Sequence, residues 1–99
     1  MRLHRIPMKF IINECFPRDI EDMDIPIHTN NIINWGHLLI AHMSDHPHVI
    51  RELMIRIQND DFTGFGKNPI EIIDNVVLNG HHRILAAWQL SKEYVMGVM

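Results

Sequence analysis

The spacing of apolar residues predicts an amphipathic helix over residues 30–43, NNIINWGHLLIAHM. An asparagine at its start, Asn30 or Asn31, is a preferred N-cap residue because its side-chain oxygen accepts a hydrogen bond from an unpaired backbone N–H. The apolar residues recur three or four positions apart, which places them on one face of a helix. They are Ile32, Trp35, Leu39 and Met43. We expect this face to pack against the rest of the protein.

A second amphipathic helix is predicted within residues 44–61, SDHPHVIRELMIRIQNDD. Pro47 suits a first helical turn, where a missing N–H costs no hydrogen bond, and Asp45 or His46 then caps the helix. Charged and polar side chains occupy one face, and the apolar residues of the other face repeat at helical spacing. The apolar residues are Val49, Ile50, Leu53, Met54 and Ile57.

Shorter apolar runs predict strands. IEII (70–73) and VVL (76–78) flank Asp74-Asn75, a pair that adopts the left-handed backbone of a tight hairpin. MKFIIN (8–13) has the apolar bias of a strand, and EYVMGVM (93–99) has the pattern of a terminal strand. Between them, residues 14–31 are rich in Asp, Pro and Asn and predict an irregular surface segment, while FTGFGKNP (62–69) predicts a loop.

A third helix is predicted over residues 81–90, HHRILAAWQL. The order of elements is then strand, helix, helix, strand, strand, helix, strand. A mixed order implies a layer structure of the α+β or α/β class. We expect α+β, with a small mixed sheet and helices packed on it. We also expect a single domain over residues 1–99, because this length supports one modest core.

Composition narrows the class of protein. The chain has 12 Asp and Glu against 9 Lys and Arg, a net charge of −3 with histidines neutral, whereas duplex DNA binders usually carry a basic face. No apolar stretch is long enough to span a membrane, and the N-terminus lacks the apolar segment of a secretory signal, so no membrane partner is expected. The single cysteine, Cys15, fits a reducing compartment. We therefore expect a cytoplasmic protein.

The segment LNGHHRI, residues 78–84, carries the strongest chemical signal. Asn79 can cap the following helix with its side chain, and Gly80 lets the backbone turn sharply. The first N–H groups of that helix have no intrahelical acceptor and favour an anion. Arg83 adds a guanidinium that fits two phosphate oxygens. His81 and His82 can donate to phosphate, gain charge beside it and shuttle a proton. The segment predicts a phosphate site, and a basic helix start that faces solvent is the alternative.

Two further cations are candidates for the same site. Lys67 lies in the glycine-bearing TGFGKNP loop, directly before the predicted strand 70–73, and can reach a bound phosphate. A solvated lysine is the alternative. Arg18 lies in FPRD near the N-terminus, where Asp19 offers it a simple salt-bridge partner instead.

A cluster of histidines in HMSDHPH raises the question of a metal site. Imidazole and carboxylate suit zinc or another transition metal. However, the predicted helix-turn-helix would scatter these side chains. We expect a histidine-rich surface turn and no metal site at these residues, which are His42, Asp45, His46 and His48.

The segment NPIEII…VVLNGHHRILAAWQLSKEYVMGVM resembles the signature half of the ParB/sulfiredoxin superfamily. In that family a "PI-x-V" strand is followed by a hairpin, and "DGHHR-xx-AA" opens a helix. HVIRELMIRIQNDDF is similar to the helix that precedes this strand, and FPRD is similar to an early proline-arginine element. The likeness extends over Val49–Val98, with a looser one in the N-terminal half.

The resemblance implies a ParB/sulfiredoxin-like fold and nucleotide binding. The superfamily contains CTP-hydrolysing partition proteins, ATP-using sulfiredoxins, free-serine kinases and phage proteins labelled ParB-like nucleases. Relatives hold phosphates at the helix-start turn, a role that carries over to Gly80, His81, His82 and Arg83. Asn79 stands where "DGHHR" relatives have an acidic residue, which removes a carboxylate that could orient a histidine or help a metal. No cysteine occupies the turn, so sulfiredoxin-type chemistry is not expected.

Three functions remain open at this point. The first is binding of ATP or CTP, alone or with Mg²⁺, with or without slow hydrolysis or phosphoryl transfer. The second is a metal-dependent ParB-like nuclease or DNA-binding protein, against which the net acidity and Asn79 both count. The third is a phage-encoded, non-catalytic module that binds a host protein.

Overall fold

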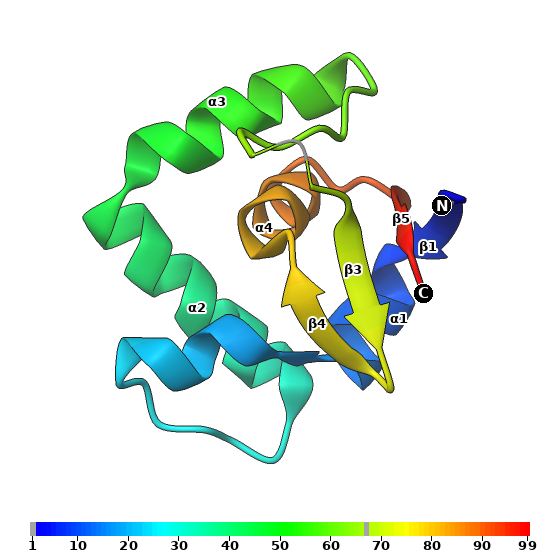
Figure 1. Ribbon diagram of the computed structural model, residues 1–99. Helices are drawn as coiled ribbons and strands as arrows, with labels where there is room; N and C mark the ends of the chain where they lie inside the picture. The colour runs from blue at the N-terminus through cyan, green and yellow to red at the C-terminus, as the bar shows by residue number, and fades with distance from the viewer. Residues whose placement is uncertain (1, 67) are drawn as a thin grey trace.

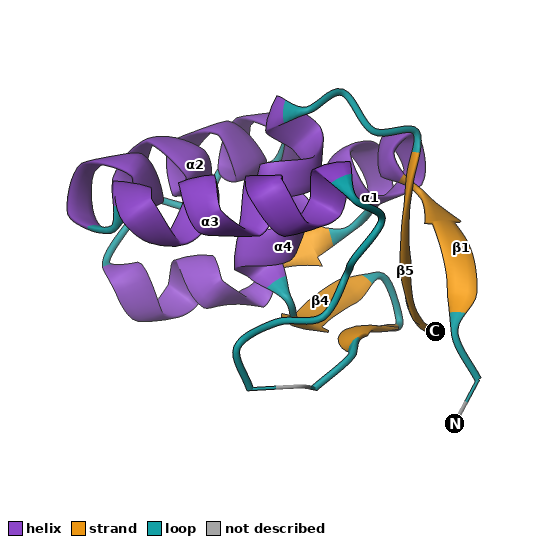
Figure 2. Ribbon diagram, turned by 90° about the horizontal axis from the view of Figure 1, so that it is seen from above, coloured by secondary structure: helices purple, strands orange, loops and turns teal. Residues whose placement is uncertain are grey.

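The computed structural model describes residues 2–66 and 68–99 (Figure 1). Within these residues the strands form a five-stranded mixed sheet in the order β1-β5-β3-β4-β2. The pairs β1–β5 and β3–β4 are antiparallel, and β3–β5 and β2–β4 are parallel. Figure 2 shows helices gathered on one side of the strands, so the predicted α+β class is confirmed. The strands are β1 (His4–Pro7), β2 (Phe16–Pro17), β3 (Ile70–Ile73), β4 (Val76–Asn79) and β5 (Tyr94–Val98).

The predicted hairpin is confirmed, and its turn shows why. Asp74 and Asn75 have φ angles of 51° and 60°, the left-handed conformation that both central residues of a type I′ turn require. Asparagine and aspartate tolerate this conformation better than other residues with a side chain beyond Cβ. The turn joins β3 to β4 and so sets where β4 begins.

The three predicted helices are also confirmed. Helix α2 (Asn31–Asp45) begins after Asn30, whose side chain accepts a hydrogen bond from the Ile32 N–H at 2.9 Å. Helix α3 (Pro47–Gln58) has Pro47 in its first turn and buries Ile50, Leu53 and Ile57 as expected. Helix α4 (His81–Gln89) follows Gly80 directly.

Two details of these helices differ from the sequence predictions. In the predicted stripe of α2, Trp35 is buried and Leu39 and Met43 pack partly buried against the core, but Ile32 is 44% exposed. Leu38 and His42 are buried in addition. The face is rotated because Trp35 turns toward α1 and donates to the Cys15 carbonyl at 2.9 Å. Asp45 does not cap α3, since it is the last residue of α2 and α3 starts without a side-chain cap.

The strand predicted for residues 8–13 is wrong, because this segment is helix α1 (Met8–Glu14). Its buried residues Met8, Ile11 and Ile12 stand three and four positions apart, the spacing of a helix rather than a strand. The run is too short for its apolar residues to distinguish the two periods. The strand at this end of the chain is β1 instead, which pairs with β5 and stops at Pro7.

Residues 14–31 are not wholly irregular or confined to the surface, as was expected. Cys15 and Ile20 are fully buried. Phe16 and Pro17 form β2, which pairs with Val76 and Val77 of β4. A 3-10 helix, η1 (Arg18–Met23), follows and places the start of this segment next to the β4–α4 turn.

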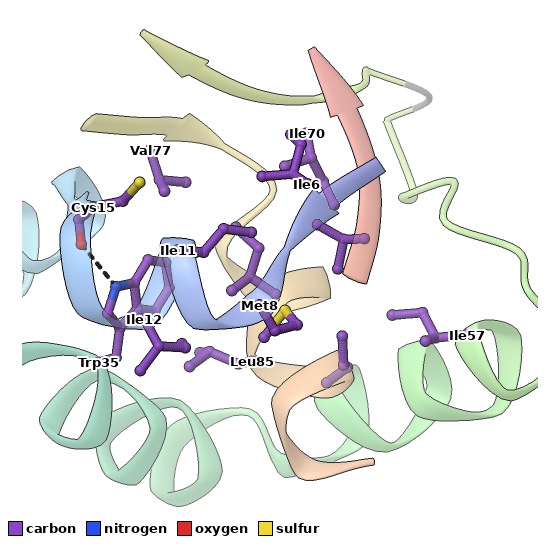
Figure 3. Packing of buried hydrophobic residues seen from close by; sticks show 14 of the residues in the cluster. Ile6, Met8, Ile11, Ile12, Cys15, Trp35, Ile57, Ile70, Val77 and Leu85 are labelled. Atoms are coloured by element: carbon purple, nitrogen blue, oxygen red, sulfur yellow. Dashed lines mark hydrogen bonds between the residues drawn. The ribbon is translucent and has the colours of Figure 1, made fainter. Parts of the chain in front are cut away.

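The core lies between the sheet and the helices. Figure 3 shows Trp35 beside Ile11, Ile12 and Leu85, with its indole N–H directed at the Cys15 carbonyl. Burial of large apolar side chains of this kind supplies roughly 1.5–3 kcal/mol each. The core therefore fixes α1, α2 and α4 relative to one another. None of the described helices is both long and apolar enough to cross a lipid bilayer.

The glycines of the described segments give a test of this fold. Gly80 has φ +92°, and a Cβ there would lie 2.5 Å from Cγ1 of Ile70. We expect Gly80→Ala to lower the free energy of unfolding by about 2–4 kcal/mol, from left-handed strain and overpacking together. Gly36 lies within α2 with nothing within 4 Å of an added Cβ. The matched variant Gly36→Ala should stabilise by about 0.5–1 kcal/mol.

Urea denaturation of both variants measures these changes. Equal effects of the two alanines would contradict the assigned contact between Gly80 and Ile70.

Candidate functional site

The turn between β4 and α4 is built around Gly80. With φ 92° and ψ 20°, Gly80 is the N-terminal flanking residue of α4, and the helix has no side-chain cap. The predicted capping by Asn79 is therefore wrong: its Nδ2 donates to the Pro69 carbonyl at 3.0 Å, because the side chain turns toward the loop before β3. The first amides of α4 have no intrahelical acceptor and are left for water or a ligand.

Two pockets flank this turn and share Asn79, Gly80 and His82. The first, which we call the arginine pocket, has a volume of about 200 Å³. The second, the η1 pocket, has a volume of about 350 Å³ and includes Arg18. The arginine pocket is lined by Val49, Leu53, Gly64, Phe65, Gly66, Asn68, Asn79, Gly80, His82 and Arg83.

Arg83 reaches from α4 toward the loop that precedes β3. Its Nη1 donates to the Phe62 carbonyl at 3.0 Å. The side chain passes so close to Gly64 that a Cβ at that position would lie 2.9 Å from Nε. Burial lowers the pKa of Arg83 from its ordinary value, but a guanidinium remains charged at neutral pH. Across residues 2–66 and 68–99, no carboxylate forms an ion pair with Arg83.

His81 is engaged within the protein. Its side chain is buried, and Nε2 accepts a hydrogen bond from the Asp19 N–H at 3.1 Å. Burial lowers its pKa to about 4, although the negative charge of Asp19 and a hydrogen bond to the backbone of Val77 oppose the change. His81 is therefore neutral at pH 7. It holds η1 against α4, and its Nε2 is not free to meet a phosphate.

His82 takes a different position. It is half-buried and lines both pockets. Its ring lies against the ring of His42 from α2, with centroids 4.2 Å apart and planes inclined by 53°. Burial lowers the pKa of His82, and the proximity of His42 lowers it further.

Behind this pair of rings lies Asp19 of η1. Its Oδ2 is 2.9 Å from Nε2 of His42. The hydrogen bond to His42 holds the pKa of Asp19 below its ordinary value despite partial burial. With the carboxylate ionised, His42 Nε2 is the donor of this bond. The other ring nitrogen of His42, Nδ1, is buried and has no hydrogen-bond partner among the described residues.

The remaining predicted site residues divide between these features. Arg18 is exposed and lines the η1 pocket, so the fold brings it to the Gly80 turn as predicted. The salt bridge considered between Arg18 and Asp19 is not formed, since the Asp19 carboxylate binds His42. Lys67 lies outside the described residues.

The residues of the histidine-rich segment differ in their exposure. On the surface, as expected, lie Asp45, His46 and His48. His42 is buried instead, with 4% of its surface exposed. Within the described part of the chain, no three His, Cys, Asp or Glu side chains are grouped closely enough to hold a metal ion.

Sequence reasoning missed Asp19 and His42 as members of the site. They are 23 positions apart, and no spacing rule connects them. One signal was present for His42: it follows Trp35 and Leu38 by seven and four positions, so it continues the buried face of α2. A histidine on a buried face needs a polar partner, and that partner is Asp19.

No protein-family model, curated protein or solved structure gives a significant match to this chain. The resemblance to the ParB/sulfiredoxin superfamily thus stays a prediction from the residues that carry it.

The Asp19–His42 bond predicts a pH-dependent contribution to stability. The pKa of Asp19 is lower in the folded protein than the value of about 3.9 expected for an unfolded chain. The bond therefore stabilises the fold fully at pH values above the unfolded pKa. This contribution is lost as the pH falls through the lower pKa of the folded protein. Asp19→Asn should lower the free energy of unfolding at neutral pH by about 1–3 kcal/mol, with a smaller difference below pH ~4.

Urea denaturation across this pH range measures the effect. Asp24→Asn removes the same charge from the exposed end of η1, at a residue with φ 54° that asparagine tolerates. It should change stability by less than about 0.5 kcal/mol. A constant difference between wild type and Asp19→Asn at all pH values would contradict the assigned bond.

Proposed function

We propose that the protein binds the phosphate groups of a nucleotide, ATP or CTP, in the arginine pocket. The observation that carries the proposal is the juxtaposition of Arg83 with the uncapped start of α4. Unpaired amides at a helix start and a guanidinium are the two groups that proteins most often direct at phosphate. The ParB/sulfiredoxin-like resemblance assigns the same role to Gly80, His81, His82 and Arg83, although Nε2 of His81 is occupied by the Asp19 backbone.

The charges around the turn favour one pocket over the other. No carboxylate is among the described residues that line the arginine pocket. The η1 pocket contains the carboxylates of Asp19 and Asp22 beside Arg18, so its charges oppose one another. We therefore place the phosphates beside Arg83. Arg18, and a Mg²⁺ ion carried by the nucleotide, would meet them from the η1 side.

A third pocket offers room for the nucleoside. It has a volume of about 450 Å³ and shares Arg83 and Asn68 with the arginine pocket. Its lining includes the apolar side chains of Leu3, Phe62 and Met96, together with the carboxylates of Asp60 and Asp61. Apolar walls with a few polar groups are typical of sites for small organic ligands. This supports a nucleotide rather than inorganic phosphate as the ligand.

Two other features agree with this proposal. The net charge of −3 disfavours DNA, which presents the same phosphate chemistry along a long polyanion.

Cys15 is buried, and burial raises the pKa of its thiol to about 11, so it remains an unreactive thiol. A buried thiol of this kind suits the cytoplasm, where we place the protein.

Binding is tested by thermal stabilisation with ATP, CTP and their Mg²⁺ complexes. Free nucleotide at tenfold its Kd should stabilise the folded protein by about 1.4 kcal/mol. Arg83→Gln should remove this stabilisation because it removes the charge. Arg51→Gln removes the same charge from an exposed position on α3 and should retain it.

Because Arg83 is buried and bonded to Phe62, Arg83→Lys is a second variant that keeps a positive charge but lacks the fork of the guanidinium. It should bind more weakly than wild type. The proposal is contradicted if none of these nucleotides changes the melting temperature of the wild-type protein.

The position of Arg83 can be tested separately from its charge. Gly64→Ala places a methyl group against Nε and should displace the guanidinium, weakening nucleotide binding about tenfold, the equivalent of one charged hydrogen bond. At Gly66 the nearest atom to an added Cβ is 3.9 Å away, so Gly66→Ala is the matched control. Isothermal titration calorimetry measures both affinities. Equal affinities of the two variants would contradict the role given to Gly64.

A further inference from the structure

Three side chains from separate elements meet beside the proposed phosphate site. Asp19 comes from η1, His42 from the last turn of α2 and His82 from the first turn of α4. The carboxylate of Asp19 is 2.9 Å from His42, and the ring of His42 lies 4.2 Å from that of His82 between centroids. His82 is the member of this row that lines both pockets at the Gly80 turn.

We propose that His82 accepts a proton from a water molecule that attacks the terminal phosphate of the bound nucleotide, and that Asp19 and His42 are positioning residues for it. This inference rests on the proposed function. In the reaction the water oxygen forms a bond to the terminal phosphorus, and the bond from phosphorus to the bridging oxygen breaks. The proton of the water passes to a ring nitrogen of His82, and the products are a nucleoside diphosphate and inorganic phosphate.

His82 suits this role better than its neighbour His81. Nε2 of His81 accepts a hydrogen bond from the Asp19 backbone, which occupies it. His82 is open to both pockets, and burial keeps it in the neutral form that a base requires at neutral pH.

Asp19, the carboxylate of this row, stabilises the charge that His82 would gain, since its negative charge raises the pKa of His82. His42 holds that carboxylate in place through its hydrogen bond. Asp19 stays ionised through its bond to His42, so a negative charge lies behind the imidazolium. The buried Nδ1 of His42 lacks a partner among the described residues. Such a group is costly in a folded protein and calls for a functional explanation.

The groups that affect the charge of His82 come from several elements. Asp19 is the group that raises its pKa, while His42 and His46 at the end of α2 lower it. The other charged or titratable side chains lining the pockets beside it, or adjacent to it on α4, are Arg18, Asp22, His81 and Arg83.

The first experiment needs no nucleotide. The pKa of His82 is measured by NMR titration of its ring resonances in the wild type and in Asp19→Asn. Because the negative charge of Asp19 raises this pKa, the variant should show a lower pKa. Asp24→Asn, which removes a charge from the same segment outside both pockets, should leave it unchanged. An unchanged pKa in Asp19→Asn overturns the positioning role.

The second experiment measures release of inorganic phosphate from Mg·ATP and Mg·CTP. At nucleotide concentrations that saturate each protein, His82→Gln should reduce the rate of release at least ~100-fold, the usual contribution of a general base. Asp19→Asn should move the acid limb of the pH profile to lower pH, since it lowers the pKa of His82. Asp24→Asn should match the wild type.

The outcomes separate this inference from the binding proposal. Absence of nucleotide binding by the wild type overturns both. Binding with no phosphate release, or with release that His82→Gln leaves unchanged, overturns only the catalytic role of His82.

Discussion

Where β4 ends, the backbone of Gly80 lies against Ile70 of β3 so closely that any larger residue would collide with it. The left-handed turn at Gly80 lets α4 start at once, without a side-chain cap. Each pocket at the turn therefore depends on this contact, because each is lined in part by Gly80.

The other half of the site comes from a segment far away in the sequence. Asp19 makes two bonds, one from its backbone N–H to His81 and one from its carboxylate to His42. Together they fasten η1 to both α4 and α2. Such polar contacts are worth little in net energy when they replace contacts with water, but they are costly to break once they are buried. They select one arrangement of η1, in which Arg18 lies at the pocket.

Burial lowers the pKa of His81, His82 and Arg83 alike, but with different results for their charge. The two histidines become neutral, whereas Arg83 stays charged because its ordinary pKa is so high. The site thus combines a permanent cation with neutral imidazoles. Under the proposed function, the arginine attracts the phosphate and the neutral ring of His82 accepts a proton.

The sequence by itself determined the elements whose signals are local. The turn residues Asp74 and Asn75, the cap at Asn30 and the glycine at position 80 act on the backbone of their own neighbours, so each could be identified from a few letters. The strand prediction for residues 8–13 was wrong because six residues are too few to reveal the period of their apolar positions. Packing of this segment into the core decided that it is a helix. The row formed by Asp19, His42 and His82 was decided by tertiary structure alone. Its members are brought together by the parallel pairing of β2 with β4 and by the burial of α2, contacts between residues that no local preference connects.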